Sequence, residues 1–443
     1  MLSCAGNKFL KTPALDSLAA EGTRFEKAYC SNPVCSPSRF SLFTGRMPGE
    51  INLYYNEEES YRREPPREIT EKGLGHLMRS AGYDTRYGGK EHMPSSGIAD
   101  YGFNSFCRDE RDGLADACVD FLKTPRDGPF FLTASFINPH DICFMAILEA
   151  LKTEEGQKRY HDYFGVGEEQ AHIKSIREAM KLPGGMSEED FVREHCPPLP
   201  DNHKPQDEEP EIIREMMRAQ YFRTVAREVY TDSRWQMQRQ VYCRLTERVD
   251  HQIGKVLQAL RQSGEYDNTV IIYTSDHGEC DGSHCMEEKV FPYEEASRVP
   301  VIISAPGFRS QSRVEQSNIV SNGLDIYPTI CDFAGAVPVA GLRGISLKPF
   351  VTGGASTINR EYIPIETVVG NGLIFKNRKY VFYNHGSHQE QIYDLIKDPG
   401  ETKNFAKDPD YRTFLNRSRT LFVREWPNQK EIDRSIDLSR FMC

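Results

Sequence analysis

Short apolar runs alternate with stretches of helical periodicity along most of the chain. The runs that fit strands are residues 130–137, 270–274 and 299–304, with weaker candidates at 22–28 and 83–87. Apolar positions recur at helical spacing over residues 12–20 and 235–263. Strands that alternate with helices build a mainly parallel sheet with helices on both faces. The pattern therefore predicts an α/β fold with a mixed, mostly parallel central sheet sandwiched by helices.

The C-terminal part of the chain has a different pattern. Its strand candidates are the alternating runs 372–375 and 380–383 and the run 391–395. A helix is expected after Asp408. We therefore expect a main domain over residues 1–358 and a small α+β subdomain over residues 359–443, with an antiparallel sheet and a helix.

Two polar segments interrupt the main domain. Between residues 143 and 227 the alternation of apolar runs and helical stretches is replaced by short charged helical segments and a loop rich in proline and acidic residues. Such a long excursion is typical of an insertion, which forms either a solvated outer layer or a rim that faces the site. Residues 57–67 carry several charges and are further candidates for substrate contacts.

Charge and composition exclude several classes of protein. The 443 residues include 55 Lys and Arg against 65 Asp and Glu, a net charge of -10, which argues against a nucleic-acid partner. No apolar run approaches the ~20 residues of a membrane span, and residues 1–11 do not form a signal core. The 12 cysteines are scattered without CxxC spacing, so most are expected to be free core thiols.

One cysteine lies in a context unlike the others. The most informative stretch is Cys35-Ser36-Pro37-Ser38-Arg39, followed after four residues by Thr44-Gly45-Arg46. Pro37 and Gly45 bracket a short helix, so Cys35 lies at a helix N-terminus, where backbone N–H groups favour an anion. Arg39 lies one turn along on the same face.

This stretch resembles the signature of the type I sulfatases, formylglycine-dependent enzymes of the alkaline-phosphatase superfamily. Further similar stretches are residues 11–19, 267–278, 391–395 and 398–401. The resemblance implies that a separate maturation enzyme oxidises Cys35 to formylglycine, whose aldehyde hydrate is the nucleophile. It also implies hydrolysis of a sulfate ester with release of inorganic sulfate, in which the cations Arg39, Lys90 and Lys289 balance the charge on the sulfuryl oxygens.

Three basic residues follow predicted strands, where α/β sites form. Lys90 and His92 come after the strand candidate 83–87, and the resemblance implies that both contact the formylglycine. A histidine titrates near neutrality, so His92 is a candidate proton acceptor, while Lys90 would hold the developing anion. His140 follows the strand candidate 130–137 and resembles a histidine that binds the sulfate ester or protonates the leaving group.

A metal site is expected after the strand candidate 270–274. Asp276 and His277 offer a carboxylate and an imidazole, which are ligand types for divalent ions. The resemblance implies that Asp276, His277 and residue 35 hold Ca²⁺, with Mg²⁺ as the alternative. Lys289 matches the second sulfate-binding lysine of the family, and His284 matches a family position less securely.

Members of this family begin with a hydrophobic strand whose end supplies two metal ligands. The sequence given starts at Met1, within a turn that resembles the one following that strand. We expect either that Met1 is internal to a longer reading frame or that the chain is an N-terminally truncated, inactive relative. A periplasmic or secreted location is expected if a signal peptide lies upstream of Met1.

The expected activity is therefore that of a sulfatase acting on a sulfated small molecule or glycan, with a sulfated carbohydrate favoured. Its expected partners are that substrate and the maturation enzyme. One alternative is a formylglycine-dependent phosphodiesterase or phosphonate monoester hydrolase, because relatives with a histidine beside the metal aspartate act on phosphorus. The other is a non-catalytic relative that binds sulfated glycans.

Overall fold

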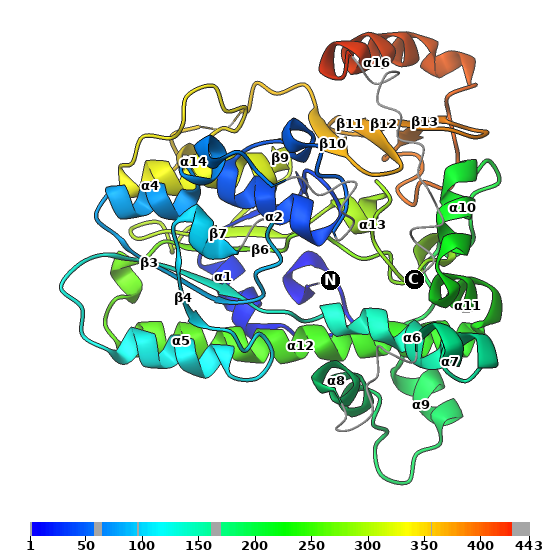
Figure 1. Cartoon of the computed structure of the whole chain (residues 1–443), viewed down its shortest axis with the longest axis horizontal. Coiled ribbons are helices and arrows are strands. Elements are labelled where there is room, and N and C mark those ends of the chain that lie inside the picture. The colour runs from blue at the N-terminus through cyan, green and yellow to red at the C-terminus, as the bar shows by residue number, and fades with distance from the viewer. Residues whose placement is uncertain (1, 57–63, 95–96, 161–169, 356, 428–443) are drawn as a thin grey trace.

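The computed structural model describes residues 2–56, 64–94, 97–160, 170–355 and 357–427 (Figure 1). The helices are α1 Pro13–Ala20, α2 Cys35–Thr44, α3 Arg67–Thr70, α4 Leu74–Ser80, α5 Leu114–Lys123, α6 Cys143–Ala150, α7 Glu154–Tyr160, α8 Ala171–Ala179, α9 Glu188–His195, α10 Glu211–Ala219, α11 Tyr221–Val229, α12 Asp232–Gln262, α13 Glu294–Ser297, α14 Asn322–Ala334, α15 Lys348–Val351 and α16 Arg412–Glu425. The strands are β1 Thr23–Phe25, β2 Ala28–Tyr29, β3 Asp84–Gly89, β4 Asn104–Cys107, β5 Phe130–Ser135, β6 Ile271–Thr274, β7 Val301–Ser304, β8 Arg313–Glu315, β9 Val320–Ser321, β10 Ile363–Glu366, β11 Gly370–Ile374, β12 Arg378–Tyr383 and β13 Glu390–Asp394.

Strand pairing in the main domain is mixed, and the α/β prediction is confirmed. Strand β3 pairs in parallel with β4 and β5, while β1 pairs with β8 and β2 with β9 in the same sense. Strand β7 pairs antiparallel with β1 and β6. Helices α5 and α12 lie on one side of these strands and α2, α4 and α14 on the other (Figure 1).

The strand expected at residues 22–28 is divided in the structure. Strand β1 pairs with β7 and β8, whereas β2 pairs with β9. The polar residues Glu26 and Lys27 separate them. The Glu26 N–H still donates to the carbonyl of Glu315 at the end of β8, whereas the Lys27 carbonyl accepts the N–H of Val320 at the start of β9. A polar pair within a short apolar run therefore marks the point where the chain changes partners.

Helix α12 organises one face of the main domain. Thr231 caps its N-terminus by accepting the N–H of Arg234. Further along, Asp250 accepts the N–H groups of Ala14 and Leu15 at 3.1 and 2.9 Å. A side chain of α12 thus provides the hydrogen-bond acceptor that these N–H groups in the first turn of α1 lack within their own helix. This fixes α1 in the position that its buried apolar face requires.

The insertion forms helices α6 to α11 and is anchored by an apolar face. Met145, Ile176 and Phe191 pack with Val241 and Leu245 of α12 in one buried cluster. The charges of α8 and α9 therefore lie on the outer faces of these helices, whereas Arg223 of α11 is buried and paired with Glu288. Residues 57–63, part of the candidate segment 57–67, lie outside the described residues.

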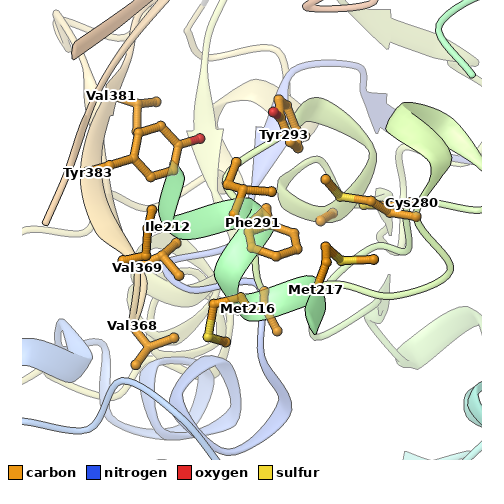
Figure 2. Close-up of a cluster of buried hydrophobic side chains, with 14 of the residues drawn as sticks. Ile212, Met216, Met217, Cys280, Phe291, Tyr293, Val368, Val369, Val381 and Tyr383 are labelled. Carbon is orange, nitrogen blue, oxygen red and sulfur yellow. The ribbon is translucent and has the colours of Figure 1, made fainter. Parts of the chain in front are cut away.

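The C-terminal sheet is an antiparallel meander of β10 to β13, and α16 packs beside it. One buried cluster joins this sheet to α10 and to the loop that precedes α13. Figure 2 shows Phe291 of that loop among Ile212 and Met216 of α10 and Val381 and Tyr383 of β12. In the described part of the chain no helix is long and apolar enough to cross a membrane.

Candidate active site

The ends of three strands meet the N-terminus of α2. Lys90 directly follows β3, and its N–H donates to the carbonyl of Ser135 at the end of β5, 2.9 Å away. Strands β3 and β5 are parallel neighbours, so the residues beyond them emerge at one edge. Asp276 and His277 follow β6, and the His277 side chain reaches Cys35, the first residue of α2.

Lysine and imidazole groups surround the Cys35 side chain. Its Sγ lies 3.1 Å from Nε2 of His277 and 3.3 Å from Nζ of Lys90, and His92 also hydrogen-bonds to it. Burial opposes ionisation of this thiol, but Lys90 and His277 outweigh burial and hold the pKa of Cys35 well below its usual value. Position 35 is therefore built to stabilise negative charge at a helix N-terminus.

Arg39 joins four separate segments of the site. Its Nε donates to Oδ2 of Asp276 at 2.9 Å. Its Nη1 donates to the carbonyl of Lys90 at 2.9 Å, to Oγ of Ser135 at 2.8 Å and to the hydroxyl of Tyr87 at 3.2 Å. Burial lowers the pKa of Arg39, but Asp276 outweighs it and raises that pKa above its usual value. The guanidinium thus stays charged and orients the residues around it.

Asp276 and His277 approach Cys35 from the end of β6. Nδ1 of His277 lies 2.7 Å from the carbonyl of Gly278, an arrangement that assigns the proton to Nδ1 and turns Nε2 toward Cys35. Burial raises the pKa of Asp276, but Arg39 and His277 outweigh it and lower that pKa to about 2. Ligand atoms of Cys35, Asp276 and His277 lie within 4.8 Å of one another.

His140 follows β5 and supplies a neutral imidazole. Burial, followed by the charges of Lys90 and Lys289, holds the pKa of His140 well below its usual value. Its Nδ1 is buried, and it has no hydrogen-bond partner within the described residues. The next residue, Asp141, is fully buried and accepts hydrogen bonds from Arg111 at 2.8 and 3.2 Å. This ion pair fixes the turn that carries His140.

Lys289 faces the site from the loop that precedes α13. Its side chain is buried, and Nζ lies 3.5 Å from Sγ of Cys143, the first residue of α6. Burial opposes the charge, but the fields of Cys143, Cys35 and nearby glutamates outweigh burial and hold the pKa of Lys289 well above its usual value. Lys289 therefore remains an ammonium group beside His140 and Cys35.

The structure brings together the side chains that the sequence singled out as catalytic or metal-binding. It also adds residues that sequence reasoning missed. Tyr87 and Ser135 orient Arg39, and Cys143 contacts Lys289. Only Cys143 carried a signal, because it follows His140 by three residues at the end of a predicted strand. His284, in contrast, stacks on Tyr293 with ring centroids 3.9 Å apart and belongs to a neighbouring buried layer.

Comparisons with known proteins agree with this geometry. The sequence profile of the Sulfatase family matches residues 1–336, and that of the N-sulphoglucosamine sulphohydrolase C-terminal region matches residues 282–423. A Delta 4,5-hexuronate-2-O-sulfatase of Bacteroides thetaiotaomicron is 28% identical over 96% of this chain and 85% of its own length.

Solved structures show the same relationship. A 2-O GAG (glycosaminoglycan) sulfatase superposes with a TM-score of 0.76 at 27% identity, covering 96% of this chain and 89% of its own. A phosphonate monoester hydrolase of Agrobacterium radiobacter has a TM-score of 0.69 at 19% identity, covering 97% and 93%, which shows a shared fold. The chain belongs to the sulfatase family and is a hydrolase of sulfate esters.

Proposed function

We propose that this sulfatase removes sulfate from a sulfated carbohydrate and that Cys35, converted to formylglycine, carries the reaction. The position of residue 35 is the observation that supports this proposal most strongly. It lies at a helix N-terminus within reach of Lys90, His92 and His277, where an attacking oxygen would need charge stabilisation. The named activities of the relatives, on a hexuronate and on a glycosaminoglycan, support the carbohydrate class.

Formylglycine supplies a hydrated aldehyde, of which one hydroxyl attacks sulfur and the other allows sulfate to be expelled. The chain's own residues then share three tasks. The ammonium groups of Lys90 and Lys289 offset the negative charge of the sulfuryl oxygens, and Arg39 keeps Asp276 and Lys90 in place. His92 is placed to accept a proton from residue 35.

Departure of the alcohol depends on the groups beyond the sulfuryl group. His140 is neutral, so it serves as a hydrogen-bonding group for the sulfate ester, while Lys289 carries the proton that a leaving oxygen requires. Cys143 holds Nζ of Lys289 from the side of α6. We therefore assign binding of the sulfuryl group to His140 and protonation of the leaving alcohol to Lys289.

Sulfatases are generally metal-binding, and Ca²⁺ was the ion expected from the sequence. Among the described residues, the cluster offers one carboxylate, one imidazole and the atom at position 35. Ca²⁺ takes ~6–8 oxygen ligands, so these groups alone do not fit a complete calcium shell, and no step above depends on an ion. Calorimetric titration with Ca²⁺ and with Mg²⁺, on the native chain and on Asp276→Asn, tests whether Asp276 is a ligand.

The test of the function uses protein coexpressed with a formylglycine-generating enzyme. Peptide mass spectrometry should show the aldehyde at Cys35, and sulfate should be released from sulfated disaccharides and aryl sulfates. Cys35→Ala should fold and release none. Full activity of protein that contains only the unmodified thiol would contradict the formylglycine mechanism. Faster release of phosphate or phosphonate than of sulfate from matched aryl esters would favour the phosphorus-directed alternative.

A further inference from the structure

A buried ion cluster connects the C-terminal sheet to the loop that carries Lys289. Lys379 of β12 is fully buried, and its Nζ lies 2.8 Å from Oε1 of Glu401 and 3.0 Å from Oε1 of Glu294. The same Nζ donates to the carbonyl of Pro292 at 2.8 Å. The N–H of Glu294 donates to Glu401 at 2.6 Å. One ammonium group thus fixes the loop at two points just beyond Lys289.

The backbone between these points and Lys289 is strained. Val290 directly follows Lys289 and has a φ of 92°, a left-handed conformation that is an outlier for a β-branched residue. Its side chain is buried, and its N–H donates to the carbonyl of Pro33 at 3.1 Å, two residues before Cys35. Such a conformation persists only where the surroundings hold it on both sides. Pro33 holds one side, and Lys379 holds the other through Pro292.

The far end of the same loop is tied to the catalytic segments. The carbonyls of Glu295 and Ala296 accept the N–H groups of Glu279 and Gly278, which directly follow His277. The carbonyl of Ser297 accepts the N–H of Cys30, upstream of Cys35. Helix α13 is therefore held in place by backbone hydrogen bonds, and the loop from Lys289 to Tyr293 connects it to the site. Figure 2 shows Phe291 and Tyr293 of this loop beside Val381 and Tyr383 of β12.

We propose that Lys379 is a positioning residue for Lys289: the C-terminal sheet holds, through Lys379, the strained loop that aims Lys289 at the leaving group. The inference rests on the proposed role of Lys289 in sulfate ester hydrolysis. Without the ammonium group, Pro292 and Glu294 lose their shared partner. The left-handed turn at Val290 then keeps only the apolar packing of Phe291 and Tyr293 and the Glu294 N–H bond to Glu401 on its C-terminal side. Lys289 Nζ then samples positions away from the departing oxygen.

The experiment compares kcat and KM over a series of aryl sulfates whose phenols differ in acidity. Lys289→Ala should lower kcat most for the least acidic phenols, because these need the proton most. Lys379→Met should show the same pattern, with a loss of about tenfold or more for poor leaving groups and little change for activated ones. Lys379→Arg, which keeps the charge, should restore much of the rate. In the Lys289→Ala background, Lys379→Met should cause no further loss.

A matched control separates positioning from stability. Leu415 of α16 is buried in the apolar cluster beside the same C-terminal sheet, and that cluster contains no residue of the Lys289 loop. Leu415→Ala should lower the melting temperature. It should not change how kcat of the folded protein depends on the acidity of the leaving phenol. If Lys379→Met does not fold, Lys379→Met with Glu401→Gln, which also removes one buried carboxylate, takes its place.

A second readout needs no turnover. Labelling of Lys289 by acetic anhydride, measured by peptide mass spectrometry, should be faster in Lys379→Met than in the native chain or in Leu415→Ala. The proposal is overturned if Lys379→Met matches Leu415→Ala in both readouts, or if its loss persists undiminished in the Lys289→Ala background. A Lys289→Ala enzyme with unaltered leaving-group dependence would overturn the role of Lys289 and this inference with it. Failure to release sulfate at all would instead contradict the proposed function, and the labelling result would still decide whether Lys379 holds the loop.

Discussion

Arg39, which is buried, and Asp276, which is partly buried, form an ion pair with 2.9 Å between Nε and Oδ2 that joins the second turn of α2 to the segment that follows β6. The pair is more than a charge contact, because Nη1 of the same guanidinium also reaches Tyr87, Ser135 and the carbonyl of Lys90. A planar group with several fixed donors satisfies these partners at once, and a point charge does not.

Arg39→Lys should therefore behave as a severe change. Lysine keeps the charge near Asp276 but loses the donors to Tyr87, Ser135 and Lys90, so Lys90 and Asp276 lose their fixed relation. We expect kcat/KM to fall by about a hundredfold or more, as for loss of a preorganised donor group, and the free energy of unfolding to fall by about 2 kcal/mol. Steady-state kinetics and urea denaturation measure the two effects.

The control for that variant is Arg46→Lys. Arg46 is bound to Glu50 four residues away on the surface, and such a pair contributes under about 1 kcal/mol. A kcat/KM for Arg39→Lys within a few-fold of that for Arg46→Lys would show that the charge alone suffices.

A second prediction concerns the turn that carries His140. Asp141 is fully buried and paired with Arg111, so Arg111→Met leaves an uncompensated carboxylate. We expect a loss of about 3–5 kcal/mol in the free energy of unfolding and a lower kcat in the folded fraction, because His140 loses its fixed position. The partly exposed pair of Arg86 and Asp84 supplies the control. Arg86→Met should cost under about 1 kcal/mol, and an equal cost for both variants would contradict the prediction.

Much of the fold and the site follows from local sequence signals. Pro37 and Gly45 bracket α2 as expected, and Gly45 ends it with a φ of 69°. The strands before His140 and Asp276 are predicted because they are short apolar runs, whereas the weaker candidate before Lys90, residues 83–87, contains Asp84 and Arg86 between its tyrosines. These signals are sufficient for Cys35, Lys90, His140 and Asp276, because each of them lies at or after the end of an element that its own neighbours determine, whereas Lys289 lies in a loop.

The contacts made by distant segments could not be predicted. Lys379 directly precedes the strand candidate 380–383, and a lysine is ordinarily exposed, yet this one is fully buried between Glu294 and Glu401. Tyr87 ends the strand candidate 83–87, and its contact with Arg39 depends on how two distant segments are placed in the fold. A one-dimensional pattern records which face of an element is apolar, but it does not record which charge will meet another across the fold.

His284 predicts a loss of stability in acid. Burial, the largest cause, lowers the pKa of His284 to about 3, so the folded chain keeps this ring neutral while the unfolded chain takes up a proton near pH 6.5. The stabilisation that the neutral ring contributes to the free energy of unfolding is complete above about pH 6.5. It is lost as the pH falls toward 3, by at most about 1.4 kcal/mol per pH unit. His284→Asn, which tolerates the positive φ of this position, should flatten the decline of the unfolding free energy between pH 6.5 and 4.5.

His195 supplies the comparison, because it is an exposed histidine at the end of α9. His195→Asn should leave the acid slope of the unfolding free energy unchanged. If both asparagine variants keep the native slope, His284 takes up protons in the folded state and its burial does not govern the acid behaviour.

Glu401 is expected to affect the pH dependence of the unfolding free energy in the opposite direction. Its carboxyl group shares one ammonium, that of Lys379, with Glu294, so the buried cluster holds more acid than base. Burial, the largest cause, raises the pKa of Glu401 to about 8, although Lys379 opposes this. Glu401→Gln replaces the group by a neutral one of similar size. We therefore expect it to flatten the dependence of the unfolding free energy on pH between about 5 and 8, measured by urea denaturation.

The sign follows from proton binding in the two states. Between about pH 4.5 and 8 the folded chain retains the proton of Glu401 while the unfolded chain releases it, so the native state binds more protons and its stability falls as the pH rises. The contribution is complete below about pH 4.5 and is lost through pH 8, with a slope of at most about 1.4 kcal/mol per pH unit. Glu68→Gln, at an exposed glutamate of α3, should keep the native slope. A Glu401→Gln protein with that same slope would mean that Glu401 is ionised in the folded chain as it is in the unfolded one.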